Sequence, residues 1–359
     1  MVPDEMGFEY PVVDPDICTG CGVCEEACAF RATRELKDTT PDAFAFRHKD
    51  PEEVAASQSG AAFIGISDVV LEDGGSVFGA CLGKDFSVSH KGADDKAGRD
   101  MMRGSKYAQS SMGGCFDEII KILGEGRTVL FSGTPCQCAA LRHIAGPLAR
   151  RLVTMDIVCH GVPAPAVWKA YLDMRASDEG SEIVDANFRD KSRFGWKNHR
   201  ESITFANGKT IDSRSYTDIF YKHLALRPSC HKCPFNNLDR PSDITIADFW
   251  GWQNTDPVLN ADDKGYSLVL VNTPEGRGIW DRCRENGHWR PVDLSTCMQR
   301  PLRENAERNP LSDKFKEDFT HNGIKYCLRH YGDWNLHSQA RYAYKWARKK
   351  LRKILLGKI

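Results

Sequence analysis

The stretch TVLFSGTPCQ, residues 128–137, indicates the fold class more clearly than any other part of the chain. Its apolar start, TVLFS, ends at Gly133 and Pro135, which is the pattern of a buried strand entering a tight turn. We expect a helix to follow from Cys138. Similar buried strands are predicted over three further ranges: 152–158, 243–247 and 267–271.

Predicted helices alternate with these strands. Residues 116–123 carry apolar side chains at helical spacing, and residues 164–174 begin with prolines suited to a first turn. Strands alternating with helices favour an α/β core. Asn207-Gly208 lies between two strand-like runs, 200–206 and 209–213, and predicts a hairpin that we expect to join that core. The predicted fold class is therefore a mixed α+β body with an α/β core.

Four segments are expected along the chain. The first is a short cysteine module at residues 1–34, and a polar stretch that runs on through His48 is interpreted as a linker. The body is then divided into residues 55–135 and 136–300. Residues 301–359 are expected to form a basic helical tail.

Composition argues against nucleic-acid binding and secretion and in favour of metal binding. The chain has 359 residues with 49 basic and 49 acidic side chains, so it offers no global charge for binding nucleic acid. It has no apolar run of about 18 residues, and acidic residues stand where a signal peptide would need a basic patch, so we expect a cytoplasmic protein. Fourteen cysteines in such a chain more often hold metal than form disulfides.

The last 19 residues are unlike the rest. Residues 341–359 contain eight Lys or Arg and no Asp or Glu. Trp346, Leu351, Ile354 and Leu355 lie among these cations, which suits an amphipathic helix on an anionic surface. A peripheral membrane contact, an acidic partner protein and a solvated packed helix all fit this pattern.

The first cysteine set is the most specific motif. It consists of Cys18, Cys21, Cys24 and Cys28, and Gly20 and Gly22 allow the loop between them to curl. Closely spaced thiolates of this kind are typical of [4Fe–4S] ligation, and a zinc knuckle is the alternative. In two-cluster ferredoxins the fourth cysteine of such a run binds the other cluster, so either Cys28 or a distant cysteine closes this one. Ala29 stands where a proline is usual.

A second cysteine set is dispersed along the body. It consists of Cys136, Cys159, Cys230 and Cys233. Cys136 and Cys159 each follow a predicted strand, so both are expected at one edge of the sheet. Spacing alone leaves three interpretations open, namely a second cluster, a structural zinc, or a CxxC pair with two unrelated thiols. The remaining cysteines are predicted to be free and buried: Cys81, Cys115, Cys138, Cys283, Cys297 and Cys327.

Seven short motifs, in order, resemble the beta-subunit family of coenzyme F-420 hydrogenases and dehydrogenases, which includes plant 7-hydroxymethyl chlorophyll a reductase. They are Gly7-Phe8-Glu9-Tyr10-Pro11, Arg103-Gly104-Ser105-Lys106-Tyr107, Phe131 to Gln137, Cys159-His160-Gly161-Val162-Pro163, Phe188-Arg189-Asp190-Lys191 with Gly195-Trp196-Lys197, Arg227-Pro228-Ser229-Cys230, and Asp248-Phe249-Trp250-Gly251. The resemblance covers about residues 7–281. It implies a ferredoxin-like module joined to a flavin-binding body.

The resemblance also implies cofactors and partners. It assigns the second cysteine set to a cluster, giving one or two [4Fe–4S] clusters in all, together with FAD. Electrons would pass to an acceptor such as coenzyme F-420, a ferredoxin or a partner subunit. Family members often carry two ferredoxin motifs, so a first motif is expected upstream of residue 1. A non-catalytic electron-transfer subunit and a zinc-stabilised binding protein are the alternative functions.

The flavin contacts are predicted from composition and from the resemblance. The loop of Arg103, Gly104, Ser105 and Lys106 offers backbone N–H groups and charge for a pyrophosphate, and a solvated basic turn is the alternative. Arg189 and Lys191 are further candidates, unless they form structural ion pairs. Ser59, Gly60, Gly133 and Thr134 complete the predicted set. The usual Ser-Ser-Gly-Gly stretch of the family reads Gln58-Ser59-Gly60-Ala61 here.

Overall fold

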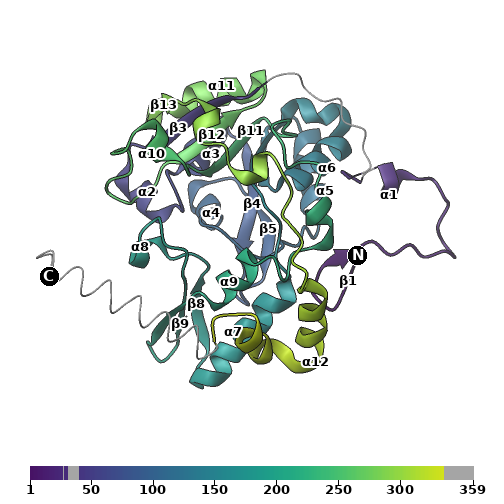
Figure 1. The fold of residues 1–359 in the computed structure, drawn as a ribbon. Helices are drawn as coiled ribbons and strands as arrows, with labels where there is room; N and C mark the ends of the chain where they lie inside the picture. Colours follow the sequence, from purple (N-terminus) through teal and green to yellow (C-terminus); the bar gives the residue numbers. More distant parts are fainter. Residues whose placement is uncertain (27, 31–39, 335–359) are drawn as a thin grey trace, which may run out of the picture.

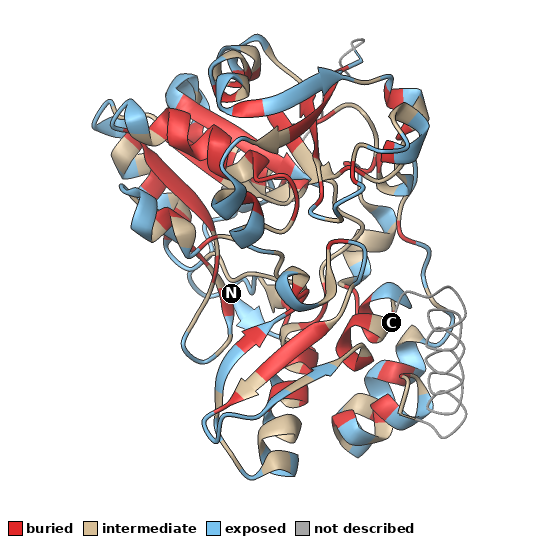
Figure 2. Ribbon diagram, turned by 90° about the vertical axis from the view of Figure 1, so that its left-hand side faces the viewer, coloured by how far each residue is buried: buried red, intermediate tan, exposed pale blue. Residues whose placement is uncertain are grey.

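A computed structural model shows two packed lobes and a projecting N-terminal segment (Figures 1 and 2). The structure describes residues 1–26, 28–30 and 40–334. The predicted basic tail at 341–359, with its membrane contact, lies outside the described residues.

The larger lobe is built on one eight-stranded sheet, in the order β13-β3-β12-β11-β7-β6-β4-β5. Its strands are β3 (Asp42–His48), β4 (Ser76–Leu82), β5 (Val88–Ala93), β6 (Val129–Gly133), β7 (Leu152–Ile157), β11 (Ile244–Asp248), β12 (Ser267–Val271) and β13 (Gly287–Pro291). The four central strands, β11, β7, β6 and β4, run parallel, and the flanking strands pair antiparallel. The sheet is mixed, as expected.

Helices cover the faces of this sheet. They are α2 (Pro51–Ala56), α3 (Ala62–Glu72), α4 (Lys96–Asp100), α5 (Cys115–Gly124), α6 (Pro135–Ala145), α10 (Trp252–Thr255) and α11 (Pro274–Cys283). The side chains of α3 and α11 share an apolar core with Phe44, Phe46 and Val269 of the sheet. Those of α5 and α6 pack on Val129 and Phe131 of β6. The alternating strand and helix pattern predicted from the sequence is confirmed.

The smaller lobe has its own core. A three-stranded antiparallel sheet, in the order β10-β9-β8, packs with helices around Trp168, Tyr171 and Tyr216. The elements are α7 (Pro165–Glu179), β8 (Ile183–Asn187), α8 (Lys191–Phe194), β9 (Glu201–Phe205), β10 (Thr210–Ser213), α9 (Ser215–Tyr221) and α12 (Ser312–His330). The buried faces of these elements are visible in the lower half of Figure 2.

Three expectations are corrected. The Asn207-Gly208 hairpin forms, as β9 and β10, but it pairs with β8 in the smaller sheet instead of joining the large one. Residues 42–48, interpreted as linker, form β3 inside the large sheet, because Ala45 and Phe46 are fully buried there. The body therefore begins before residue 55. Residues 312–330 of the predicted tail form α12, which packs against α7 in the core of the smaller lobe.

The N-terminal segment extends away from both lobes (Figure 1). It contains a two-stranded ribbon, β1 (Val2–Pro3) with β2 (Glu9–Tyr10), and the short helix α1 (Val23–Glu26). Phe8 is buried in the core of the smaller lobe, so the ribbon is attached there. The first cysteine set lies beyond this attachment.

Candidate redox site

Two members of the second cysteine set lie at the carboxyl edge of the large sheet. Cys136 is in the first turn of α6, directly after β6, and Cys159 follows the end of β7. Because β6 and β7 are parallel neighbours, their ends meet at one edge. The turn into α6 is shaped by Thr134, whose N–H donates to Oε1 of Gln137 at 2.9 Å, and by Pro135 at the first helical position. The sequence prediction of a shared edge is confirmed.

The other two members are brought to the same place by a loop pairing. Cys230 lies in a 3₁₀ turn, Pro228–Lys232, just before Cys233. The Arg227 N–H donates to the Val162 carbonyl at 3.0 Å, which joins this segment to the loop after Cys159. Gly161 permits the contact: its φ is +124°, and a Cβ there would lie 3.3 Å from Cβ of Cys230 and 2.8 Å from Leu226.

The four thiols are half-buried and lie close enough to influence one another electrostatically. Burial raises the pKa of Cys136 and of Cys159, and it raises the pKa of Cys230 to about 12, with the neighbouring thiols contributing at Cys159 and Cys230. Hydrogen bonds partly oppose this rise, since Gly161 N–H donates to Sγ of Cys159 at 3.4 Å and Oγ1 of Thr134 lies 3.2 Å from Sγ of Cys136. Thiols that resist ionisation in this way become thiolates when a bound metal replaces their protons.

Ligation by cysteine sulfur is the chemistry of a [4Fe–4S] cluster and also of a structural zinc site. Within residues 1–26, 28–30 and 40–334, no three His, Cys, Asp or Glu side chains are gathered as ligands of one metal ion. Zinc requires four ligands on one ion. In a [4Fe–4S] cube each thiolate binds a different iron, so the four sulfurs surround the cube and lie farther apart.

Arg227 supplies a cation beside this set. Its charge favours the thiolate forms of Cys136 and Cys230. The guanidinium donates to the Glu9 carbonyl at 2.9 Å and lies 4.3 Å from the centre of the Tyr10 ring. This contact explains why Gly7-Phe8-Glu9-Tyr10-Pro11 is a recognisable motif: the segment holds a cation next to the cysteines. The motif that contains Arg227 was visible in the sequence, but the role of this side chain was not.

The first cysteine set has a different environment. Cys18, Cys21 and Cys24 are exposed and Cys28 is half-buried. Gly20 and Gly22 have φ angles of +70° and +75°, so the loop curls at the two glycines as expected. The Phe30 ring lies 6.0 Å from the Phe235 ring, edge to face, and Phe235 is two residues after Cys233. The segment that follows the first set therefore contacts the chain two residues beyond the second set.

A cavity of about 240 Å³ gathers part of the predicted flavin-contact residues. Gly104, Arg189 and Lys191 line it together with residues 55–58. Lys191 Nζ donates to the carbonyls of Val54, Ser59 and Lys264, and in the described part of the chain no carboxylate is hydrogen-bonded to it. All three of its N–H groups are therefore used by carbonyls, and its positive charge lies on the wall of the cavity.

Arg189 is held more rigidly. It is fully buried, it pairs with Asp248, and it donates to the Trp196 carbonyl. This is the structural ion pair that the sequence left open as the alternative. Arg189 consequently orients one wall of the cavity and has less of its charge to offer a ligand than Lys191.

The Arg103–Lys106 loop is tied to the protein. Arg103 pairs with Glu53 and, at 2.9 Å, with Asp100. Lys106 Nζ donates to the carbonyls of Met102 and Arg103 at 2.7 Å. Ser105 is half-buried, and Gly104 is exposed with a φ of +82°. Among these four residues, Gly104 is the one that lines the cavity.

The other predicted contacts serve the backbone. Ser59 Oγ donates to the Tyr266 carbonyl, and a Cβ at Gly60 would lie 2.1 Å from the Phe46 carbonyl oxygen, so Gly60 lets this turn pack on β3 and β12. Gly133 and Thr134 shape the turn that presents Cys136. These residues position the cavity and the cysteines, and none of them lines the cavity.

An aromatic cluster between the cysteines and the cavity was missed by the sequence reasoning. Here it is called the ring cluster: Tyr107, His160, Trp196, His199, Phe220, Tyr221 and Trp250. It begins at His160, beside Cys159, and ends at Trp196 and Trp250, whose rings stack 4.2 Å apart next to Arg189. Local pattern could not reveal it, because its members come from seven positions spread over 144 residues.

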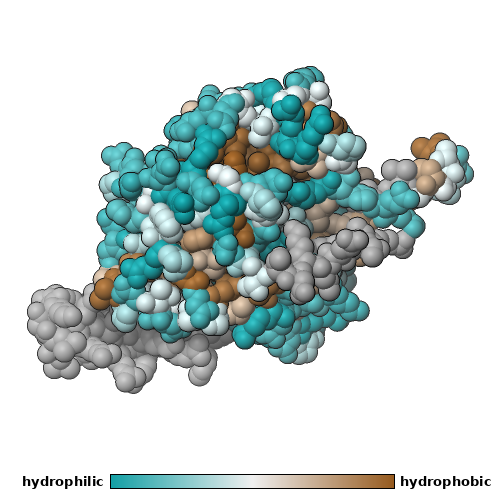
Figure 3. Space-filling view, turned by 90° about the horizontal axis from the view of Figure 1, so that it is seen from above, coloured by the Kyte–Doolittle hydropathy of each residue, from teal (hydrophilic) through white to brown (hydrophobic). Residues whose placement is uncertain are grey.

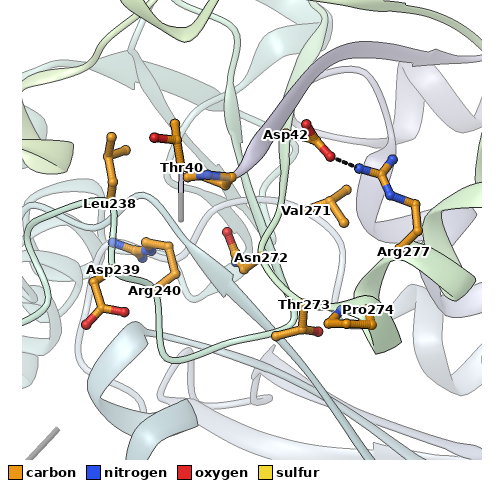
Figure 4. A pocket seen from close by; sticks show the side chains of 11 residues that line it. Thr40, Asp42, Leu238, Asp239, Arg240, Val271, Asn272, Thr273, Pro274 and Arg277 are labelled. Atoms are coloured by element: carbon orange, nitrogen blue, oxygen red, sulfur yellow. Dashed lines mark hydrogen bonds and ion pairs between the residues drawn. The ribbon is translucent and has the colours of Figure 1, made fainter. Parts of the chain in front are cut away.

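A separate pocket, of about 300 Å³, contains none of the predicted residues. It lies at the start of β3, the end of β12 and the start of α11 (Figure 4). Asp42 and Arg277 pair across it, and Arg240 on its wall is buried against Asp156. Its charged groups neutralise one another, so the site at the sheet edge remains the better candidate.

Comparison with known families agrees with this geometry. Residues 126–295 match the family that covers the C-terminal part of the beta chain of coenzyme F420 hydrogenase/dehydrogenase. Over that range, this chain is similar to the F420 hydrogenase/dehydrogenase beta-subunit family. Residues 10–33 match a 4Fe–4S binding domain. The recognition made from the motifs is confirmed, and the combination gives the chain a redox role in electron transfer.

The fold of this chain is also found among solved structures. A chain from a xenon-derivatised structure of the F420-reducing [NiFe] hydrogenase complex from Methanosarcina barkeri superposes with a TM-score of 0.51 and 16% sequence identity, covering 81% of this chain and 92% of that chain. No curated protein matches. In the part of the chain that the structure describes, no helix is both long and apolar enough to cross a membrane.

Proposed function

We propose that this chain is an iron–sulfur flavoprotein oxidoreductase. Cys18, Cys21, Cys24 and Cys28 would hold one [4Fe–4S] cluster, and Cys136, Cys159, Cys230 and Cys233 a second. FAD would bind at the cavity beside Lys191 and exchange electrons with an acceptor such as coenzyme F420, a ferredoxin or a small molecule. The observation that carries the proposal is the meeting of four half-buried, electrostatically coupled thiols at the edge of the sheet.

The proposed flavin site rests on the charge and backbone groups at the cavity wall, where a phosphate could be held. The cavity of about 240 Å³ offers the Lys191 cation and the exposed backbone at Gly104, which suit a phosphate. A bound flavin would supply two-electron chemistry, while each cluster exchanges single electrons. The protein residues would orient the cofactor and exclude water, and the ring cluster would separate it from the second cysteine set.

A partner protein is part of the proposal. Three of the four cysteines in the first set are exposed, and Val12, Val13 and Ile17 beside them are also exposed. Figure 3 shows apolar atoms on this projecting segment, at the right. A cluster in this position could exchange electrons with a second redox protein, which would be either a ferredoxin or a catalytic subunit.

The test is anaerobic purification followed by iron, sulfide and flavin assays. We expect about eight irons and eight sulfides per chain, as two cubes require, and one FAD. A preparation that contains zinc but neither iron nor flavin would contradict the proposal. Lys191→Met should lower FAD affinity by about tenfold, whereas Arg193→Met, an exposed cation on the same short helix, should not change it.

The pH dependence of flavin binding gives a second check. Burial lowers the pKa of Lys191 to about 8 from 10.5. An anionic cofactor needs the protonated amine, so FAD affinity should fall as pH rises through 8. Unfolding of the protein does not explain such a loss. Between pH 8 and 10.5, Lys191 is protonated in the unfolded chain and largely neutral in the folded protein. This lysine therefore makes the free energy of unfolding rise with pH in that window. Equilibrium dialysis at pH values on either side of 8 measures the effect.

A further inference from the structure

Arg227 is held by uncharged groups, although it lies beside the second cysteine set. Its guanidinium donates to Oε1 of Gln109 at 2.8 Å and to the Glu9 carbonyl at 2.9 Å, and it lies 4.3 Å from the centre of the Tyr10 ring. The Glu9 carboxylate instead accepts from Oγ of Ser111 at 3.3 Å. In the described part of the chain, this guanidinium is therefore hydrogen-bonded to no carboxylate, and no ion pair neutralises its charge there.

Arg47 has similar contacts but is neutralised. Its guanidinium lies 4.0 Å from the centre of the Tyr266 ring, and its Nε donates to the Gly265 carbonyl at 2.8 Å. Asp262 adds an ion pair to Arg47 at 2.8 Å. The two arginines therefore differ in this carboxylate partner, which makes Arg47 a control for the charge of Arg227.

The charge of Arg227 acts on the cysteines themselves. Arg227 lies three residues before Cys230, and its N–H donates to the Val162 carbonyl in the loop after Cys159 at 3.0 Å. Burial raises the pKa of Cys136 and of Cys230, and the Arg227 cation opposes this rise at both thiols. A cation that stabilises negative sulfur also stabilises further negative charge placed on those sulfurs.

Cluster reduction adds such a charge. One electron gives one more negative charge to the cube and its thiolates, with no proton transferred and no bond broken. We propose that the Arg227 guanidinium, held in place by the ribbon of β1 and β2, raises the reduction potential of the second cluster; this inference rests on the proposed function. When electrons enter through the projecting segment, the first cluster is oxidised as the second is reduced, and a higher potential of the second favours that direction.

The ribbon links this cation to the first cysteine set. Glu9 and Tyr10 form β2, and Phe8, whose ring centre lies 5.6 Å from the guanidinium, anchors the ribbon in the smaller lobe. The same segment continues to Cys18. The part of the chain that carries the first cluster therefore also holds the cation that acts on the second.

The test is a redox titration of the anaerobic, full-length protein, followed by EPR. The signal that persists in Cys21→Ser belongs to the second cluster. We expect Arg227→Gln to lower the equilibrium constant for reduction of this cluster by about tenfold, which is about 59 mV for a one-electron couple. Arg227→Lys, which keeps the charge, should stay within about threefold of wild type. Tyr10→Leu, which removes the supporting ring, should lower the constant by about threefold. Arg47→Gln should equal wild type.

Two results would overturn the inference. One is an unchanged potential in Arg227→Gln with its iron content intact. The other is an equal shift in Arg227→Lys and Arg227→Gln, which would assign the effect to side-chain shape and not to charge. If Arg227→Gln does not retain its iron, Tyr10→Leu decides, because it leaves the cation in the chain, and an unchanged potential in that variant contradicts the inference. If iron and sulfide assays find no second cluster in the wild-type protein, it is the proposed function that fails.

Discussion

The two cysteine sets differ in almost every physical respect except their number of thiols. The first is held by a glycine-curled loop and is mostly exposed, while the second is assembled from two strand ends and a turn that are far apart in sequence. The first set can be recognised by its spacing, because a short loop alone determines how its cysteines lie relative to one another. The second depends on the whole sheet. Ligands that lie close together in the sequence can be predicted from their spacing. Ligands that come from distant segments can be recognised as one set only when the fold is known.

The same difference predicts how each set responds to damage. A cluster on the projecting segment can be lost with little effect on the lobes. A cluster at the sheet edge joins elements of the core, because its four ligands come from α6, the loop after β7 and the segment formed by the Pro228–Lys232 turn and Cys233. Metal binding there contributes directly to folding free energy.

Cys159→Ser should have the largest effect. It should remove about four irons per chain, and lower the free energy of unfolding by roughly 4 kcal/mol or more, as expected for loss of a structural metal site. Iron assay and anaerobic thermal denaturation measure both. Cys138→Ala, a buried thiol on the same helix as Cys136, should retain the iron. Full iron content in Cys159→Ser would exclude the second cluster.

Cys21→Ser should remove a similar amount of iron while leaving the melting temperature of the lobes within about 2 °C of wild type. The reason is that this cysteine is exposed on a segment outside both lobes. Calorimetry on the same samples as for Cys159→Ser gives a direct comparison. An equal loss of stability in both variants would contradict the distinction between the sets.

A pair of glycines sharpens the contrast without replacing a cysteine. Gly161→Ala combines an unfavourable φ of +124° with a clash at Leu226, and should destabilise the protein by about 3 kcal/mol. Gly22→Ala, with a φ of +75° and open space around it, should cost only about 1 kcal/mol. Anaerobic urea titration gives both values. The order should persist whether or not iron is bound.

Phe30→Ala should have the smallest effect. Loss of its edge-to-face contact with Phe235 removes about 1 kcal/mol of attachment, so the first set should spend less time near the second. Rapid-freeze EPR of the two clusters after mixing with reductant should show slower equilibration, by up to about fivefold, with iron content unchanged. Phe319→Ala, a partly buried ring on α12, provides the control.

Much of the fold was accessible from the sequence because its strands are short, apolar and bounded by turn residues. The range 267–271 agrees with β12 residue for residue, and 128–132 differs from β6 by a single position at each end. The hairpin at Asn207-Gly208 was also predictable, since its turn is local. Its partner was not, because β8 is selected by the core around Trp168 and Tyr216 and not by the turn.

The errors have a common cause. Residues 42–48 follow a polar stretch and contain Arg47 and His48, so their sequence does not resemble a buried strand. In the structure they form β3, and its residues Ala45 and Phe46 are fully buried. Among the predicted flavin contacts, charge on a glycine-rich loop could be read from the sequence, but its pairing could not. Glu53 and Asp100 already neutralise Arg103, and the charge that Lys191 offers becomes apparent only once its three carbonyl partners are placed.

The contact between Phe30 and Phe235 has a consequence for the route of electrons. It fixes the point at which a projecting arm meets the lobes, two residues from Cys233. Under the proposed function, an electron from any protein that binds the outer face of that arm would enter the lobes at this contact. A change of external partner would then require substitutions in the projecting arm alone, and the electron-transfer path inside the lobes would stay the same.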